Sequence, residues 1–464
     1  MVMNGNRAPA VLWYALGTLV LPTPVVGQHF PDVERLEEII RARVEEGRAT
    51  GIVLGLLEAD GTRRVVAYGD PGQNARSLGA QSVFEIGSIS KVFTGILLAE
   101  MAGRGEVSLE APVQAYEHEG VTIPSRGGRE ITLLDLATHR SSLPRLPGNM
   151  RAADPRNPYA DYTVEQLHEF LSGHGLRRDI GSEYEYSNLA VGLLGHILAA
   201  RAGTEYETLL RERILDPLGM TMSGIALSPD MEVWLAKGHD QAGNPAENWD
   251  LPTLAGAGAI RSNMDDMLTF LEANIGDPTS DLERAMRVSH EPRRDVSAVM
   301  SVGLNWHIRS VGDHRIVWHN GGTGGYRTFA GFDPERRVGA VVLTNSARDA
   351  DDIGFHLLND QLELTPAPTP ISERVEVPVP PEILERYTGE YELTPEFVFT
   401  VTRDGDALRA QLTGQPVLPV FAESETEFFY RVVDAQITFV VENGETTALI
   451  LHQGGAHQTA RKIR

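Results

Sequence analysis

The chain has 464 residues, a net charge of −23 and no cysteine. The length is sufficient for two domains, and the absence of cysteine excludes disulfides and thiol catalysis. The excess of acidic side chains argues against nucleic acid and anionic membranes as partners, because both would repel the protein.

The first residues predict a signal peptide at 1–27. Arg7 supplies a positive start, Ala10 to Val20 form an uncharged apolar run, and Val25-Val26-Gly27 is typical of a cleavage site. The apolar run is too short to span a bilayer, so we expect no integral membrane segment once the signal is removed. We therefore expect a periplasmic or secreted protein.

The first large domain, 28–364, is predicted to be α+β. Helices are expected at 31–46, 88–103, 131–138, 163–171, 189–202, 206–218, 263–275 and 353–362. Strands are expected at 52–57, 64–68, 302–309, 314–318, 328–332 and 338–344. Strands from both ends most simply join one antiparallel sheet, flanked by helices and accompanied by a helical lobe. A cleft between sheet and lobe is the natural place for a site.

A second domain is predicted after a proline-rich linker at 365–382. Strands are expected at 389–391, 397–403, 407–412, 416–421, 427–432, 437–442 and 447–452. Short strands with regular turns predict a small all-β barrel or sandwich over 383–464. No group of catalytic residues occurs in it.

Ser88 and Lys91 stand three residues apart at the start of a predicted helix. Residues i and i+3 share a helix face, so we expect the Lys91 amine close enough to take the Ser88 hydroxyl proton. Only three of the 41 basic residues are lysines, and a desolvated lysine, unlike arginine, can act as a base. A capping serine followed by a solvated lysine is the alternative interpretation.

Two further motifs follow in order. Tyr186-Ser187-Asn188 precedes a helix, and His319-Asn320-Gly321 leads into Gly322 between two predicted strands. Taken singly, a capping loop and a glycine turn explain them. Their order after Ser88 and Lys91 is much harder to explain by chance.

With these motifs the chain resembles the serine β-lactamase-like hydrolases, which include class C β-lactamases, penicillin-binding DD-peptidases, family VIII esterases and D-aminopeptidases. The resemblance covers 30–362 and extends to Phe84-Glu85-Ile86-Gly87 and to the segment 133–139. The linker and tail resemble the lipocalin-like C-terminal domain that some of these hydrolases carry.

The resemblance implies a role for each residue. Ser88 attacks a carbonyl and forms an acyl-enzyme. Lys91 and Tyr186 carry out the proton transfers, one as base and one as relay, and the pKa values of both are lowered by burial and by each other's charge. Asn188 binds the substrate amide or positions Lys91. The oxyanion hole is formed by backbone N–H groups of Ser88 and Gly322. His319 and Gly321 lie along the edge where the substrate binds.

His319 departs from most of the family, in which this motif begins with lysine. A histidine is mostly neutral near pH 7 and binds a carboxylate less well. We therefore predict an exported esterase or D-amino-acid-type peptidase acting on small esters, or on amides that lack a nearby carboxylate, with weak β-lactam hydrolysis left open.

No metal-binding spacing or phosphate-binding glycine loop occurs in the sequence, so we expect no metal and no cofactor. The scattered histidines are interpreted as structural or solvated: His118, His174, His239, His290 and His356. The alternative function is a catalytically silent binding protein for peptidoglycan fragments or a lipophilic ligand. A tail that gates the cleft or forms a homo-oligomer is a further hypothesis.

Overall fold

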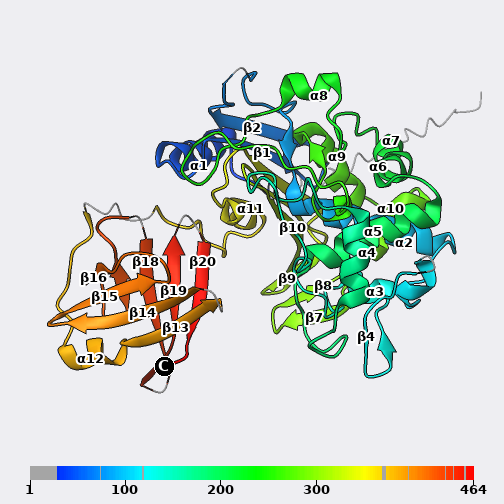
Figure 1. Cartoon of the computed structure of the whole chain (residues 1–464). Helices are drawn as coiled ribbons and strands as arrows, with labels where there is room; N and C mark the ends of the chain where they lie inside the picture. The colour runs from blue at the N-terminus through cyan, green and yellow to red at the C-terminus, as the bar shows by residue number, and fades with distance from the viewer. Residues whose placement is uncertain are drawn as a thin grey trace, which may run out of the picture.

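The computed structural model describes residues 29–464 except 74, 118–119, 368–372, 395–396, 434, 443 and 454–455. The predicted signal peptide and His118 lie outside the described residues. Figure 1 shows two units, a larger mixed one and a barrel, joined by the segment that follows the helix α11.

The larger unit is built on one eight-stranded antiparallel sheet. Its strands, in spatial order, are β2 (Arg63–Gly69), β1 (Gly51–Leu57), β12 (Val338–Thr344), β11 (Arg327–Asp333), β10 (His314–Gly322), β9 (His307–Val311), β8 (Met300–Val302) and β7 (Arg294–Ser297). The pairing of β1 with β12 confirms that strands from both ends of the domain share one sheet.

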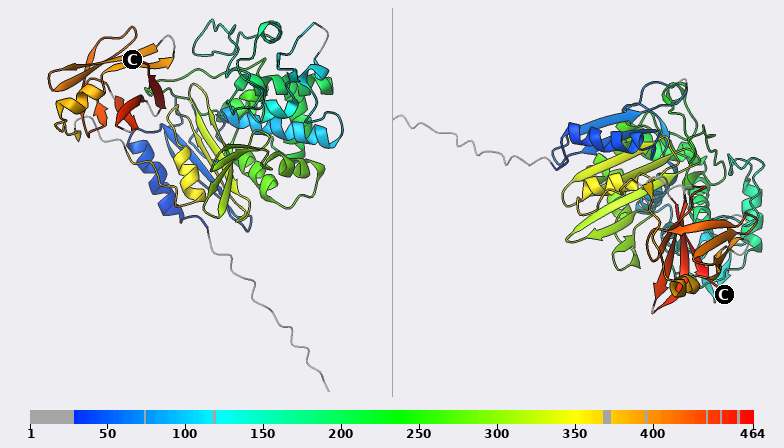
Figure 2. Two further views of the ribbon diagram at one scale, coloured as in Figure 1. Left: turned by 90° about the horizontal axis from the view of Figure 1, so that it is seen from below. Right: turned by 90° about the vertical axis from the view of Figure 1, so that its left-hand side faces the viewer.

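Helices cover both faces of this sheet, as Figure 2 shows. One face carries α1 (Val33–Glu45) and α11 (Asp351–Leu358); the other carries α2 (Ser90–Gly103) and α9 (Met264–Ile275). Every residue of β1 is buried, and successive side chains alternate between the two layers. Thus Val53 packs in the core that contains α2 and α9, and Leu54 in the core beneath α1 and α11.

The remaining helices lie between the two groups of strands in sequence. They are α3 (Leu133–Ala137), α4 (Val164–Gly173), α5 (Asn188–Ala202), α6 (Tyr206–Leu210), α7 (Asp216–Leu218), α8 (Pro229–Trp234) and α10 (Asp281–Ser289). Polar caps determine where several begin: Thr163 forms a capping box with Gln166 in α4, and the Ser187 hydroxyl accepts from Ala190 N in α5. A π-helical turn at Arg211–Leu215 joins α6 to α7.

Several sequence expectations for the larger unit need correction. The strand expected at 302–309 is the end of β8, a turn and the start of β9, because Asn305 adopts a φ of 66° there. The strand expected to end at Trp318 continues to Gly322, so the histidine motif lies within β10 rather than after it. The helices α8 and α10 have no counterpart among the expected elements.

The C-terminal unit is a closed barrel of eight strands. They are β13 (Gly389–Thr394), β14 (Phe397–Asp404), β15 (Ala407–Leu412), β16 (Leu418–Ala422), β17 (Glu427–Phe429), β18 (Ala435–Glu442), β19 (Glu445–Gln453) and β20 (Ala456–Lys462). The last strand was not expected, and it closes the barrel by pairing with both β19 and β13. The α+β architecture followed by an all-β barrel is confirmed.

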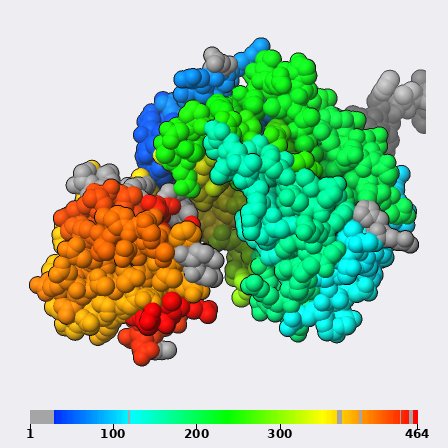
Figure 3. Space-filling model, in the orientation of Figure 1, coloured from blue at the N-terminus to red at the C-terminus, as the bar shows by residue number. Residues whose placement is uncertain are grey.

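Aromatic side chains fill the barrel interior. The rings of Tyr387 and Phe439 stack with centroids 4.2 Å apart, and Phe428 meets Phe439 edge-on. Part of the expected linker belongs to this unit, because Val377 N donates to Ala422 O (2.9 Å) and α12 (Pro381–Arg386) begins at Pro381. Figure 3 shows a hollow between the barrel and the helical lobe.

Candidate active site

Ser88 lies in a short 3-10 turn, η1 (Gly87–Ile89), which runs directly into α2. Lys91 is the second residue of α2, and its Nζ lies 3.0 Å from the Ser88 Oγ. Gly87 and Ile89 are buried, whereas Ser88 is partly exposed. The arrangement places the hydroxyl of a partly exposed serine beside a buried amine.

Lys91 is fully buried and has one other hydrogen bond, from Nζ to Ala257 O at 2.6 Å. Ala257 ends the 3-10 turn η4 (Ala255–Ala257). Burial lowers the pKa of Lys91 well below its usual value, and the charge of Arg145 lowers it further. An uncharged amine at this position can accept a proton.

Tyr186 lies two residues before α5, and its ring covers the amine, with the Lys91 Nζ 4.9 Å from the ring centroid. A hydrogen bond to the Ser88 side chain lowers the pKa of Tyr186, but burial outweighs it and raises the pKa overall. The lowered pKa expected for this phenol is therefore wrong. The raised pKa keeps Tyr186 a neutral phenol near pH 7.

Asn188 is the first residue of α5, and its side-chain amide donates to the Tyr159 hydroxyl at 3.0 Å. Its other polar atom, Oδ1, is buried and has no hydrogen-bond partner among the described residues. A buried carbonyl oxygen without a partner is costly, so it is available to a substrate N–H. This favours the substrate-binding role over a role in positioning Lys91.

The strand β10 passes close to η1, and glycines permit the approach. A Cβ on Gly321 would lie 1.9 Å from Ile86 O, and one on Gly87, whose φ is +52°, would lie 2.6 Å from Gly322 N. The Thr328 hydroxyl donates to Ile86 O (2.9 Å) from the neighbouring strand β11. The backbone at Gly322 is thereby brought against the turn that holds Ser88.

His319 points from β10 toward Tyr186, with ring centroids 6.1 Å apart. It is fully buried, its Nδ1–H donates to Asn320 O (2.6 Å), and its Nε2 has no partner among the described residues. Burial lowers the pKa of His319 well below its usual value. The imidazole is therefore neutral at physiological pH.

The structure adds two histidines and a tyrosine that the sequence reading missed. The His139 ring lies 4.5 Å from the Tyr186 ring, and its Nδ1 accepts from Ser187 N at 3.2 Å. His307 lies 5.0 Å from the His319 ring and shares a 2.8 Å hydrogen bond with the Tyr184 hydroxyl. His307 is the register partner of Trp318 at the start of β9, and its ring also contacts those of Tyr186 and His319, which strand pairing alone does not predict.

Among the described residues, no group of three or more His, Asp or Glu side chains is arranged to hold a metal ion. The scattered histidines have local partners. His239 and His356 contact backbone oxygens of Asn345 and Leu362 through Nδ1, His174 stacks on Phe170, and His290 packs edge-on against Phe332.

Comparison with known proteins agrees with this geometry. The model of the Beta-lactamase family matches residues 36–362, and that of a domain of unknown function, DUF3471, matches 373–462. The chain therefore belongs to the Beta-lactamase family, whose members are serine hydrolases. The family resemblance noted from the motifs is confirmed.

Individual relatives are similar over most of their length. The chain is 32% identical over 319 residues to the D-alanyl-D-alanine-carboxypeptidase/endopeptidase AmpH of Escherichia coli, covering 64% of this chain and 80% of that protein. It is 24% identical to Penicillin-binding protein 4* of Bacillus subtilis, covering 84% and 89%.

Solved structures share the fold. The β-lactamase/D-alanine carboxypeptidase of Yersinia pestis superposes with a TM-score of 0.61 at 23% identity, covering 71% of this chain and 98% of that one. The octameric penicillin-binding protein homologue of Pyrococcus abyssi reaches 0.65 at 22% identity, covering 93% and 100%. Within the described part of the chain, no helix has the length and apolar character needed to cross a membrane.

Proposed function

We propose that the protein is an exported serine hydrolase that works through an acyl-enzyme on Ser88, as an esterase or a D-amino-acid-type peptidase. The observation that carries the proposal is the contact of the Ser88 hydroxyl with a buried, uncharged amine under a neutral phenol. Two titratable groups whose pKa values are pushed in opposite directions suit a base and an acid.

The Lys91 amine takes the hydroxyl proton as the Ser88 Oγ forms a bond to the substrate carbonyl carbon. The charge that develops on the carbonyl oxygen is met by backbone N–H groups of Ser88 and Gly322. Tyr186 gives a proton to the departing alcohol or amine as the bond to carbon breaks, and Lys91 restores that proton. Water then releases the acyl group by the reverse sequence.

The substrate class follows from the site and from the relatives. The unpartnered Oδ1 of Asn188 is suited to the N–H of an acylamino group, which peptides and β-lactams carry. The name of the Escherichia coli relative refers to carboxypeptidase and endopeptidase activity on D-alanyl-D-alanine, which supports a peptide substrate. Weak β-lactam hydrolysis remains part of the proposal.

The test is a substrate panel with wild type and Ser88→Ala: 4-nitrophenyl butyrate, D-alanine 4-nitroanilide, acetyl-D-alanyl-D-alanine and nitrocefin. We expect Ser88→Ala to lower kcat at least about 10³-fold, since the nucleophile and its partners act as a unit. Intact mass after treatment with a penicillin is expected to show one adduct in wild type and none in the variant. Equal rates or equal labelling of the two proteins would end the proposal.

Export is tested separately by expressing the whole chain and analysing cell fractions. We expect a mature protein beginning near Gln28 outside the cytoplasm, since 1–27 has the features of a cleaved signal. An uncleaved cytoplasmic product would contradict export without touching the catalytic proposal.

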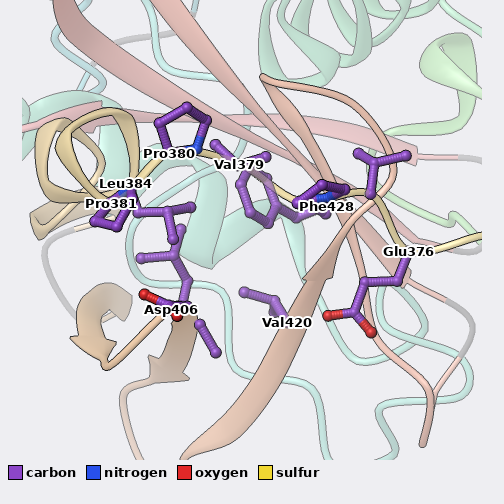
Figure 4. A pocket seen from close by; sticks show the side chains of 13 residues that line it. Glu376, Val379, Pro380, Pro381, Leu384, Asp406, Val420 and Phe428 are labelled. Carbon is purple, nitrogen blue, oxygen red and sulfur yellow. The ribbon is translucent and has the colours of Figure 1, made fainter.

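A second candidate function belongs to the barrel unit, in which a half-open pocket of about 690 Å³ lies between the segment 376–381 and strands β15 to β17 (Figure 4). Apolar side chains line most of it, and two carboxylates stand at its edge: Val377, Val379, Leu384, Leu408, Val420 and Phe428, with Glu376 and Asp406. Glu376 is already paired with Arg431 (2.9 Å). A small lipophilic ligand fits this lining.

A neutral fluorescent probe, N-phenyl-1-naphthylamine, tests the pocket. We expect saturable binding to wild type that Val379→Asp weakens at least about tenfold, because a charge is then buried in the apolar wall. Val375→Asp is the matched control in the same segment, since Val375 is 72% exposed and outside the lining. Equal affinity for both variants would exclude this pocket as the binding site.

A homo-oligomer is proposed on one observation only. The octameric Pyrococcus abyssi homologue is similar to 93% of this chain, so the likeness extends over both units. Light scattering of the full chain after size exclusion is expected to give a mass above that of one chain. A monomer at micromolar concentration would contradict it.

A further inference from the structure

Arg145 is attached by its backbone to the loop that carries the catalytic phenol. Its carbonyl oxygen accepts from Asn188 N at 3.0 Å and from Leu189 N at 3.2 Å. The Ser187 hydroxyl donates to the preceding carbonyl, Pro144 O, at 2.7 Å. These bonds hold the Cα of Arg145 in a defined place beside Tyr186, and they do not involve its side chain.

The guanidinium of Arg145 lies over the Tyr186 ring, with Cζ 5.2 Å from the centroid. The residue is exposed, and no hydrogen bond or ion pair joins its side chain to any described residue. Arginines nearby differ: Arg129 pairs with Asp135 (2.8 Å), and Arg140 donates to the carbonyl of Gly181 (3.2 Å). The Arg145 guanidinium therefore keeps its hydrogen-bond donors available to a ligand, next to the phenol that contacts the reactive serine.

Other basic groups around Ser88 do not supply a positive charge. Burial lowers the pKa values of Lys91, His139, His307 and His319, which keeps all four uncharged at neutral pH. Arg327, on the neighbouring strand β11, already has hydrogen-bond and charge partners within the protein. It donates to the carbonyls of Thr323 and Tyr326, both at 3.0 Å, and faces the carboxylates of Asp349 and Asp351.

We infer that Arg145 binds a carboxylate of the substrate and so selects esters and amides that carry a free carboxylate close to the bond being cleaved. The planar guanidinium offers two parallel N–H donors that match a carboxylate, and it keeps its charge at any physiological pH. The inference rests on the proposed acyl-enzyme function. It reverses the expectation, drawn from His319 alone, that substrates lacking a carboxylate are preferred.

The experiment compares two substrates that differ only in charge: mono-4-nitrophenyl glutarate and its methyl ester, each releasing nitrophenol. The quantity measured is the ratio of kcat/KM for the anionic ester to that for the neutral ester. A change that alters the rates of both substrates by the same factor leaves this ratio unchanged. The same comparison is made with acetyl-D-alanyl-D-alanine and its C-terminal amide.

We expect Arg145→Ala to lower the ratio about 10- to 100-fold, the range of one charge-assisted contact, and Arg145→Glu to lower it further. Arg145→Lys should keep part of it, because the charge remains and the fork is lost. Arg151→Ala is the matched control: Arg151 is an exposed arginine of the same loop whose guanidinium donates to Gly148 O and Met150 O. Its ratio should equal that of wild type.

Two different results distinguish failure of the Arg145 inference from failure of the acyl-enzyme proposal. If Arg145→Ala slows both esters equally and leaves the ratio unchanged, Arg145 acts only through Tyr186 and Lys91, and the inference is overturned. If Ser88→Ala hydrolyses both esters at the wild-type rate, the acyl-enzyme proposal itself fails. Truncating an exposed side chain that makes no hydrogen bond or ion pair with a described residue is not expected to unfold the protein. Arg145→Lys retains the charge and most of the side chain, so it serves as a second variant if Arg145→Ala is unstable.

Discussion

Two side chains that touch the same hydroxyl have opposite protonation tendencies, and burial causes both. Loss of water disfavours the charged form of every group, so the pKa of Lys91 falls and that of Tyr186 rises. The sequence reading left open which of the two is the base. The opposed shifts favour the amine as base and the phenol as acid.

This assignment predicts the pH profile of kcat/KM. Lys91 is active when uncharged, so the rate should rise with pH through its lowered pKa and then level off. Arg145→Ala removes a positive charge that lowers this pKa, so the rising limb should move to higher pH. The other groups facing the amine, which are Tyr186, His139, His307 and His319, are unchanged. A limb that does not move, measured with the neutral ester, would contradict Lys91 as the base.

At the scale of elements, the site depends on the close approach of β10 to η1, which leaves no room for a side chain at Gly321 or Gly87. Gly321 has no room for a Cβ against Ile86 O, so any side chain there must push the strand away. Displacement of about 1 Å costs roughly 100-fold in rate when reacting groups must be aligned.

Gly321→Ala is therefore expected to lower kcat at least about 100-fold while the protein remains folded. Gly79→Ala is the control, because nothing lies within 4 Å of a Cβ at that position and its φ is not positive. Rates are measured with 4-nitrophenyl butyrate, and folding by circular dichroism. Near wild-type activity of Gly321→Ala would show that the close approach is not required.

The whole molecule has separate cores for its two units. Two hydrophobic clusters lie in the larger unit, one on each face of the sheet, and a third fills the barrel. The first two are joined through the sheet between them, whose strands contribute side chains to both, and the barrel cluster shares no residue with either. Cooperative unfolding follows a shared core, so the units should unfold independently.

Calorimetry of the full chain should accordingly show two transitions. Acylation of Ser88 by a penicillin should raise the transition of the larger unit only, because a group bound to the folded form stabilises the unit that holds it. Ser88→Ala treated in the same way should show no shift. A single transition, or equal shifts of both, would mean that the units are coupled.

The stability of the larger unit should also fall in acid. Burial lowers the pKa of His290 to about 4, against 6.5 for the free side chain. The unfolded chain therefore binds a proton that the folded chain refuses, so the contribution is complete above pH 6.5 and is lost as pH falls toward 4. At pH 4 the loss in free energy of unfolding from this one group is about 3 kcal/mol.

His290→Gln tests this term, because glutamine carries no charge at either pH. We expect the difference in free energy of unfolding between pH 7 and pH 4, measured in urea, to shrink by about that amount. An unchanged difference would show that the ring is protonated in the folded state.

The local sequence was sufficient to predict those features that depend on residues close together in the chain. The spacing of Ser88 and Lys91 places them on one helical turn, and the continuous apolar runs of β1 and β12 are typical of strands buried on both faces. The order of the three motifs pointed to the family because each lies next to an element that a sequence pattern can indicate.

Tertiary structure alone decided what depends on distant segments. The neutral state of Tyr186, the ring of His307 beside His319 and the unpaired guanidinium of Arg145 each arise from segments far apart in sequence. Barrel closure likewise needs β20 to meet β13. Burial and strand pairing are properties of the packed chain, and no local pattern encodes which charge will face which partner.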